Sequence, residues 1–283
     1  MKIPVRTTLL SVAGIAALGY GSIVAMLLWL QGRLIYPLER IRDIPPHPDA
    51  DRLSPAVVRT RDGLEIGIRY KPPATPDAAT IVLFHGNGED LSQRVHIAHA
   101  LVEVGYGVVL AEYRGYGGNP GKPHEAGLYA DGRAALEFAY RQTSRVVLHG
   151  YSLGSGVAVQ MATEYPVEAL LLEAPFTCMA DVARTRFPYV PVRWMLRDRY
   201  DNLAKIGAVR APVLIYGGLA DQLIPPRQFA ALHAAVPGLR RLVLIDDADH
   251  VDVWTKGGAG HVLSFLRALP AGTRRASPDT RMR

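Results

Sequence analysis

One serine in this sequence lies in a setting that favours nucleophilic chemistry. A short β-branched run at residues 146–149 leads into Gly-Tyr-Ser-Leu-Gly at residues 150–154, and a helix-forming run follows. A strand that turns sharply into a helix through Gly-x-Ser-x-Gly presents the serine hydroxyl at the apex of a strained turn. The two glycines suit that turn because side chains there would clash. Ser152 is therefore the predicted nucleophile, and a serine in an ordinary strand-to-helix turn is the alternative.

A serine hydroxyl needs a base, and two histidines lie late enough in the chain to be candidates. His250 directly follows a predicted strand at residues 242–245, so it is expected at the carboxyl edge of the sheet, where Ser152 also lies. His261 falls within a predicted helix, where packing or solvent exposure is more typical. His250 is therefore the expected base.

The base in turn needs a carboxylate that orients it, and two acidic residues end predicted strands. Asp221 follows the strand predicted at residues 213–216, and Glu173 follows the strand predicted at residues 169–172. Asp221 is preferred because its distance from the strand end lets it approach His250 in the next loop. Glu173 stays open as the alternative acid.

The tetrahedral intermediate of acyl transfer needs two hydrogen-bond donors. One expected donor is the backbone N–H of Leu153, directly after the predicted nucleophile. The other is the backbone N–H of Asn87, in the His-Gly-Asn-Gly loop that follows a predicted strand at residues 80–84. His85 in the same loop is expected to brace the loop rather than to react.

The remaining chain alternates predicted strands and helices that would position these residues. Strands are expected at residues 80–84, 107–113, 145–149, 169–172, 213–216 and 242–245, and helices at 92–104, 125–141, 153–164, 227–235 and 260–269. A hairpin at residues 56–70 precedes them. This alternation predicts an α/β fold with a mostly parallel sheet, helices on both faces and ligands at the carboxyl ends of the strands.

Residues 175–211, called the insertion below, interrupt the alternation. They hold Phe187, Tyr189, Trp194 and Met195 among arginines and prolines. Above a strand end, such a segment predicts a small lid, and a packing element without substrate contact is the alternative. On the lid hypothesis Trp194 contacts the substrate. Tyr151, beside the predicted nucleophile, is the second expected substrate-binding residue.

The N-terminus predicts a membrane anchor at residues 1–33. Residues 7–30 contain no charge and would form a helix of roughly 36 Å, enough to cross a bilayer core of ~30 Å. A cleaved signal peptide is the alternative, disfavoured because the run is long and no small-x-small site follows. Basic residues flank both sides and leave the orientation open, with a slight preference for a periplasmic catalytic domain on a bacterial inner membrane.

Three further segments follow from composition along the chain. Residues 34–55 are rich in proline and predict a stiff linker, so a protein truncated to begin near residue 43 is expected to be soluble and active. Residues 56–269 form the predicted catalytic domain. Residues 270–283 predict a disordered basic tail.

Composition also excludes several function classes. The chain has 283 residues and a net charge of +6, but its basic residues are scattered, which argues against a nucleic-acid partner. A single cysteine excludes an internal disulfide. Without a cysteine cluster or a His-x-x-x-His motif, neither a metal site nor a cofactor is expected. The oligomeric state is left open.

Three motifs in order carry a family resemblance. They are His-Gly-Asn-Gly at residues 85–88, Glu-Tyr-Arg-Gly-Tyr-Gly-Gly-Asn-Pro-Gly-Lys-Pro at 112–123 and Gly-Tyr-Ser-Leu-Gly-Ser-Gly at 150–156. With the apolar N-terminus and Leu-Ile-Tyr-Pro at 34–37, the chain resembles a membrane-anchored branch of the α/β-hydrolase superfamily. That branch contains the α/β-hydrolase domain-containing proteins, among them protein depalmitoylases, and bacterial relatives.

The resemblance runs from about residue 34 to about residue 269. It implies Ser152, Asp221 and His250 as nucleophile, acid and base, with Asn87 and Leu153 as oxyanion donors. One departure lies before the base, where Asp-Ala-Asp-His at residues 247–250 replaces the usual glycine-containing loop.

The expected function is hydrolysis of carboxylic ester or thioester bonds through an acyl-enzyme. Acyl or lipid-like substrates suit a site near a membrane. An aminopeptidase-like amide hydrolase is one alternative, and a catalytically idle binding protein on the same fold is another.

Overall fold

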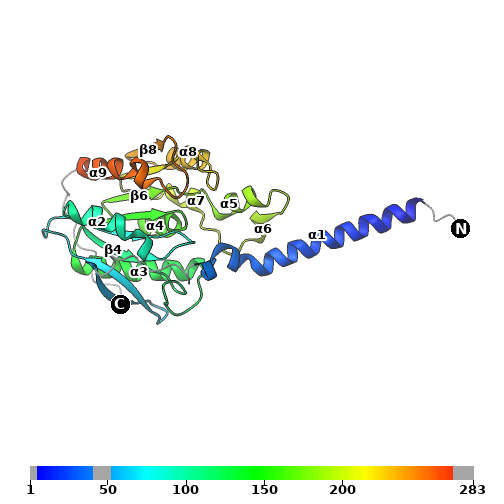
Figure 1. The fold of residues 1–283 in the computed structure, drawn as a ribbon, viewed down its shortest axis with the longest axis horizontal. Coiled ribbons are helices and arrows are strands. Elements are labelled where there is room, and N and C mark those ends of the chain that lie inside the picture. The colour runs from blue at the N-terminus through cyan, green and yellow to red at the C-terminus, as the bar shows by residue number, and fades with distance from the viewer. Residues whose placement is uncertain (1–4, 41–51, 270–283) are drawn as a thin grey trace.

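The computed structural model describes residues 5–40 and 52–269 (Figure 1). A long N-terminal helix, α1 (Val5–Ile35), projects from an α/β domain that holds the rest of the described chain. The predicted tail at residues 270–283 and residues 41–51 of the predicted linker lie outside the described residues.

The centre of the domain is an 8-stranded sheet in the order β1-β2-β4-β3-β5-β6-β7-β8. The first two strands form an antiparallel hairpin, β2 pairs antiparallel with β4, and all other pairs are parallel. The strands are β1 (Ser54–Arg59), β2 (Glu65–Lys71), β3 (Thr80–Phe84), β4 (Gly107–Ala111), β5 (Val146–Tyr151), β6 (Ala169–Glu173), β7 (Val213–Gly218) and β8 (Arg240–Ile245). The predicted mostly parallel α/β sheet is confirmed.

Helices cover both faces of this sheet. One hydrophobic cluster packs α3 (Glu125–Gln142), α4 (Leu153–Glu164) and α8 (Pro226–Ala235) against one face. A second cluster packs α2 (Val95–Glu103) and α9 (Ala259–Ala268) against the other. The shorter helices are η1 (Leu38–Arg40), η3 (Leu91–Arg94), α5 (Met179–Arg186), α6 (Val192–Met195), α7 (Asn202–Ile206) and the π-turn η4 (Trp254–Gly258).

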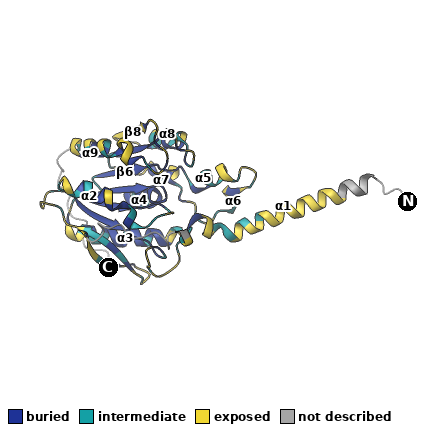
Figure 2. Ribbon diagram, viewed as in Figure 1, coloured by how far each residue is buried: buried dark blue, intermediate teal, exposed yellow. Residues whose placement is uncertain are grey.

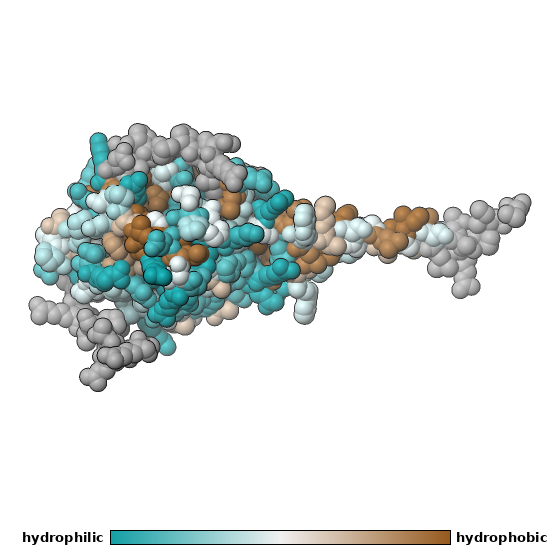
Figure 3. Space-filling model, turned by 90° about the horizontal axis from the view of Figure 1, so that it is seen from below, coloured by the Kyte–Doolittle hydropathy of each residue, from teal (hydrophilic) through white to brown (hydrophobic). Residues whose placement is uncertain are grey.

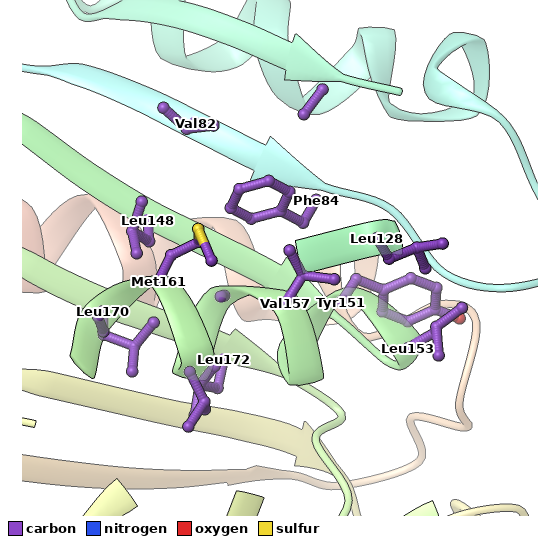
Figure 4. Close-up of a cluster of buried hydrophobic side chains, with 14 of the residues drawn as sticks. Val82, Phe84, Leu128, Leu148, Tyr151, Leu153, Val157, Met161, Leu170 and Leu172 are labelled. Carbon is purple, nitrogen blue, oxygen red and sulfur yellow. The ribbon is translucent and has the colours of Figure 1, made fainter. Parts of the chain in front are cut away.

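Helices bury both faces of the sheet, which explains why the sequences of the central strands are continuous apolar runs. Every residue of β3, β5 and β6 is buried, and Figure 2 shows the strands as the dark interior of the domain. In Figure 4, Met161 of α4 lies beside Leu148 of β5 and Leu170 of β6, and Val157 of the same helix lies nearer Phe84 of β3. This packing holds the N-terminus of α4 rigidly at the carboxyl edge of the sheet.

Several element boundaries differ by one or two residues from the sequence-based expectation, and two differences have a clear physical reason. The first strand begins at Ser54 rather than residue 56, and it includes Pro55. An edge strand tolerates proline because one side of its backbone has no partner to lose. The helix expected at residues 92–104 is divided into η3 and α2. Asp90 caps the N–H of Ser92 in a capping box that starts the 3₁₀ turn before the α-helix begins.

Helix α1 is long and apolar enough to cross a membrane. Its segment Ser11–Ile35 has a mean hydropathy of 1.9, and none of the most apolar window is buried against the protein. Figure 2 shows this helix as mostly exposed, and Figure 3 shows apolar side chains along it.

The end of α1 is not part of a linker, which corrects the expectation for residues 34–37. Ile35 and Tyr36 are only 7% and 4% exposed and belong to the core cluster on the α4 face of the sheet. The hydroxyl of Tyr36 donates to Asp198 Oδ2 at 2.8 Å and lies 2.8 Å from the hydroxyl of Tyr200. The chain therefore enters the domain at Ile35, before the proline-rich stretch begins.

For this reason we expect truncation to residue 43 to destabilise the domain rather than release it intact. Burying a large apolar side chain contributes roughly 1.5–3 kcal/mol, so losing Ile35 and Tyr36 should cost about 3–6 kcal/mol of unfolding free energy. Urea denaturation of this truncated protein would measure the loss. A matched truncation that begins at Gln31 keeps both residues and should unfold near the full-length midpoint. Equal midpoints for the two truncations would contradict the expectation.

Candidate active site

Ser152 lies at a strained turn between β5 and α4. Its backbone has φ +49° and ψ −116°, a conformation that non-glycine residues rarely adopt. A Cβ atom on Gly150 would lie 2.6 Å from the carbonyl oxygen of Gly154, and one on Gly154 would lie 2.1 Å from that of Phe84. Both positions therefore require glycine. The N–H of Ser152 donates to the carbonyl of Glu173 at 3.0 Å and ties the turn to β6.

The structure brings Ser152, His250 and Asp221 together in one buried line. His250 Nε2 lies 3.0 Å from Ser152 Oγ, and His250 Nδ1 lies 2.7 Å from Asp221 Oδ2. A carboxylate only accepts hydrogen bonds, so Nδ1 carries the proton and donates it to Asp221. The other nitrogen, Nε2, is then free to accept the hydroxyl proton of Ser152.

The carboxylate of Asp221 is fixed by the loop after β7. Its Oδ1 accepts from the N–H groups of Leu223 at 2.9 Å and Ile224 at 2.8 Å, which leaves Oδ2 directed at His250. The N–H of Ala220 donates to the carbonyl of Ala248 at 3.0 Å and joins this loop to the loop after β8. Because β7 and β8 run parallel, both loops leave the same edge of the sheet.

The loop that carries His250 shows how this chain departs from the glycine-containing pattern. Asp247 stands at a position where the family resemblance implies glycine, and it takes the left-handed φ of +57°. Aspartate tolerates this conformation better than most residues. Asp249 Oδ1 accepts the N–H of His250 at 2.7 Å, and Asp252 Oδ1 accepts the N–H of Asp249 at 2.7 Å. Carboxylates thus brace the loop that glycine would leave freer.

The alternative acid, Glu173, lies in a different network below the turn. It is fully buried, accepts the hydroxyl of Tyr216 at 3.2 Å and lies 3.5 Å from Arg94 Nη1. Burial alone would raise the pKa of Glu173, but the charge of Arg94 and the neighbouring donors outweigh it and lower that pKa. Within the described part of the chain, Asp221 and not Glu173 is the carboxylate that contacts the imidazole ring of His250.

His85 braces the loop after β3 through both of its ring nitrogens. Its Nε2 lies 2.5 Å from Glu112 Oε1 and its Nδ1 lies 2.7 Å from the carbonyl oxygen of Gly86, so both ring nitrogens face acceptors. Burial alone would lower the pKa of His85, but the carboxylate of Glu112 outweighs it and raises that pKa. Glu112 Oε2 also accepts the N–H of Leu91 at 3.0 Å. This buried pair holds the backbone of the loop next to Asn87.

The two expected oxyanion donors both lie beside Ser152. Asn87 and Leu153 line the same cavity as the serine, and neither backbone N–H donates to a protein acceptor among the described residues. The Asn87 loop is held from two sides. The backbone carbonyl of Asn87 accepts a hydrogen bond from the hydroxyl of Tyr116 at 3.2 Å. The side-chain amide of Asn87 donates to the carbonyl of Ile35 at 3.0 Å.

A mostly apolar cavity of about 400 Å³ extends from Ser152 between the insertion and α1. Its wall on the α1 side comes from Leu27, Leu28, Gln31, Arg33, Leu34, Ile35 and Pro37. The insertion forms the opposite wall with Phe176, Met179, Val182, Ala183, Arg186, Phe187, Val190, Val192, Met195 and Leu196. The loop after β7 adds Leu223 and Ile224. The described residues include no group of three or more His, Cys, Asp and Glu side chains placed to hold a metal ion.

The expected contact of Trp194 with the substrate finds no support in the cavity and stays a prediction. Its side chain is 88% exposed and does not line the cavity, whereas Phe187 and Met195 do. Met195 and Trp194 are neighbours on α6, and successive helical side chains point in different directions. The sequence placed the aromatic cluster over the site but held no signal for which members face inward.

The expected contact of Tyr151 with the substrate likewise finds no support in the cavity and stays a prediction. Its side chain is buried and is not part of the cavity wall. The hydroxyl of Tyr151 donates to the carbonyl of His250 at 3.2 Å, and the guanidinium of Arg94 lies 3.6 Å from its ring centroid. Tyr151 therefore supports the His250 loop from below. Sequence reasoning missed the α1 residues in the wall, although the apolar Leu-Ile-Tyr-Pro run at residues 34–37 was a signal that the chain already packs there.

A mostly parallel sheet, with a serine on a strained turn after β5 and a histidine after β8, defines the α/β-hydrolase class. The chain belongs to the α/β-hydrolase family. The family profile described as serine aminopeptidase, S33, matches residues 75–205. The protein Rv2307c of Mycobacterium tuberculosis is 38% identical over 256 residues, which cover 87% of this chain and 90% of that protein.

Other relatives and solved structures agree with this assignment. The α/β-hydrolase domain-containing protein WAV2 of Arabidopsis thaliana is 27% identical over 67% of this chain and 69% of its own length. The Pyrococcus furiosus esterase Pf2001 matches with a TM-score of 0.65 and 16% identity over 77% of this chain and 90% of that one. A bacterial membrane phospholipase A matches with a TM-score of 0.58 and 18% identity, and the match covers 93% of this chain and 100% of that one. At these identities the two structures show a shared fold alone.

Proposed function

We propose that this protein is a serine hydrolase that cleaves ester or thioester bonds through an acyl-enzyme. The observation that carries the proposal is the contact of His250 with both Ser152, at 3.0 Å, and Asp221, at 2.7 Å. Ser152 Oγ attacks the carbonyl carbon of the substrate while His250 Nε2 takes the hydroxyl proton. The carbonyl oxygen becomes an oxyanion, and the N–H groups of Asn87 and Leu153 stabilise it.

The intermediate then breaks down in two stages. The C–O or C–S bond to the leaving group breaks, and His250 gives its proton to the departing alcohol or thiol. Water next attacks the acyl-enzyme while His250 accepts its proton, and Ser152 leaves with that proton as the free acid is released. Asp221 keeps Nδ1 protonated throughout and stabilises the imidazolium formed in each stage.

The cavity supports acyl substrates over peptides with a free amino terminus. Among the described residues that line it, the charged ones are Arg33 and Arg186, and none is a carboxylate. An ammonium group bound there would lack a negative partner, which is costly in a partly desolvated site. An acyl chain only needs apolar contacts. The aminopeptidase-like alternative, suggested by the name of the family profile, therefore ranks second.

We also propose that α1 anchors the protein in a bilayer. Its Ser11–Ile35 segment is apolar, and none of the most apolar window is buried against the described domain, unlike the core helix of a soluble protein. A signal sequence passes the same test of length and composition. The packing of Ile35 and Tyr36 in the domain core favours retention of at least the end of the helix, because cleavage beyond Tyr36 would remove both residues from the core.

Labelling by a fluorophosphonate, followed by a panel of esters, tests the proposed activity. We expect the full-length protein in detergent to be labelled on Ser152 and to hydrolyse p-nitrophenyl esters. The ratio kcat/KM should rise by up to roughly fourfold per added methylene until the cavity is filled, because each buried methylene contributes ~0.8 kcal/mol. Amino-acid p-nitroanilides are the comparison. Turnover of the anilides but not of the esters would reverse the ranking of the two activities.

A further inference from the structure

Helix α1, the proposed membrane anchor, directly contacts Asn87 of the proposed active site. The carbonyl of Ile35, the last residue of α1, accepts the side-chain amide of Asn87 at 3.0 Å. The backbone N–H of Asn87 is one of the two proposed oxyanion donors. Ile35 itself is 7% exposed and belongs to the same core cluster as Leu153. The helix therefore reaches the catalytic edge of the sheet and is more than a tether at a distance from it.

One face of α1 forms a wall of the cavity. The lining residues Leu27, Leu28, Gln31, Leu34 and Ile35 follow the spacing of a single helical face. Leu27 lies eight residues before Ile35, so it is roughly 12 Å farther from the catalytic end along the helix axis. A short acyl group on Ser152 stays near Ile35, and only a long chain extends to Leu27.

The insertion runs along the same helix. The hydroxyl of Tyr20 donates to the carbonyl of Tyr189 at 2.9 Å, and the N–H of Arg197 donates to Gln31 Oε1 at 3.0 Å. Tyr20 lies roughly 22 Å from Ile35 along the axis. Figure 1 shows α5 and α6 beside the inner end of α1. The cavity therefore lies between the insertion and the C-terminal part of α1, from Leu27 to Ile35. The apolar N-terminal part of the same helix extends away from the domain (Figure 1).

The geometry of α1 sets the level of the insertion relative to a bilayer. The candidate span Ser11–Ile35 contains Tyr20, so the contact with Tyr189 lies within the apolar segment that would cross the bilayer. A spanning α1 therefore brings the tip of the insertion into the lipid layer. The aromatic side chains there, Tyr189 and Trp194, are both 88% exposed, as is typical of residues at a membrane interface.

We infer that α1 is a wall of the acyl-binding site, and that the substrate is a long-chain acyl ester held in the same bilayer as α1. This inference rests on the proposed hydrolase function. It assigns the helix a part in substrate specificity. The acyl chain lies along Leu34 and Leu27 with its carbonyl at Ser152, and the insertion covers its other side with Phe187 and Met195.

Substitution of Leu27 by tryptophan tests the wall. In full-length protein reconstituted in phosphatidylcholine vesicles, Leu27→Trp should lower the ratio of kcat/KM for p-nitrophenyl dodecanoate to that for the acetate at least tenfold. The added ring displaces two or more methylenes, each equivalent to roughly fourfold. Met26→Trp adds the same bulk at the adjacent position, which is exposed and outside the cavity, and should leave the ratio unchanged.

The possible results separate the inference from the function on which it rests. Fluorophosphonate labelling of each variant reports an intact site, and Leu27→Phe supplies a milder change that should act in the same direction. An unchanged ratio in labelled Leu27→Trp and Leu27→Phe proteins would overturn the wall, while the hydrolase proposal would stand. A wild-type protein that turns over neither ester would overturn both.

Presentation of the substrate tests the shared bilayer. A long-chain ester, p-nitrophenyl palmitate, should be hydrolysed at least tenfold faster when it is loaded into the vesicles that carry the protein than when it is supplied in separate vesicles. The acetate ester, which dissolves in water, is the matched control and should show no such difference. Equal palmitate rates in the two arrangements would overturn this part of the inference.

Discussion

Replacing Ser152 with alanine should abolish ester hydrolysis, with a loss in kcat on the order of 10⁴-fold or more. The oxygen of Ser152 is the atom that forms the acyl-enzyme, and no binding contact can replace it. Residual turnover would come only from the oxyanion donors and from binding. The fold should be intact because the hydroxyl contacts only His250 among the described residues, so the thermal midpoint should stay near that of the wild type.

Ser155→Ala is the matched control, since Ser155 lies one turn into the same helix. Its hydroxyl donates to the carbonyl of Ser152 at 2.6 Å and lies 3.3 Å from the side-chain amide of Asn202. Losing these buried bonds should cost about 1–3 kcal/mol of stability while fluorophosphonate labelling persists. Labelling that survives in Ser152→Ala and disappears in Ser155→Ala would reassign the nucleophile.

The second largest effect is expected from Asp221→Asn, which should lower kcat about 10³- to 10⁴-fold. An asparagine amide placed toward His250 Nδ1 donates a hydrogen bond, so it favours the tautomer that protonates Nε2. That tautomer cannot accept the proton of Ser152. The change is nearly isosteric, and its side-chain oxygen can still accept from Leu223 and Ile224, so the loop after β7 should keep its conformation.

Glu173→Gln makes the same chemical change at the neighbouring strand end and should have the opposite profile. Arg94 would lose one of its two carboxylate partners and keep Glu89, at 2.7 Å. Breaking a buried ion pair typically costs about 3–5 kcal/mol, so the unfolding midpoint should fall clearly. The loss in kcat should stay within about tenfold. Steady-state kinetics and thermal melts on both variants decide the matter, and the reverse order of activity losses would make Glu173 the orienting acid.

The sequence determined the architecture because its signals are local. Buried parallel strands must be apolar along their whole length, so β3 and the strands near it were recognisable as short runs between turns. The Gly-x-Ser-x-Gly turn was recognisable because strand and helix approach too closely for side chains at Gly150 and Gly154. Parallel strands end at one edge, so chain order alone predicted that Ser152 and His250 would meet.

Long-range contacts decided between the two candidate acids. Glu173 ends one parallel strand and Asp221 follows another, so both carboxylates lie at the same edge of the sheet. The local sequence pattern could therefore favour one of them as the acid but could not decide between them. The structure separates them by their partners. Glu173 is held by Arg94, which comes from η3 far earlier in the chain, whereas the carboxylate of Asp221 is turned toward His250 by its own loop. No periodicity in the sequence carries this information.

The inward and outward faces of the insertion and of α1 were decided only by the tertiary structure. The helix α6 is a single turn, too short to show an amphipathic repeat, so the outward direction of Trp194 could not be read from its neighbours. Helix α1 is apolar all round, and such a helix has the same hydropathy whether lipid or protein covers a given face. Its role as a cavity wall follows from which side chains lie opposite Phe187 and Met195, and that depends on how the folded domain meets the helix at Ile35.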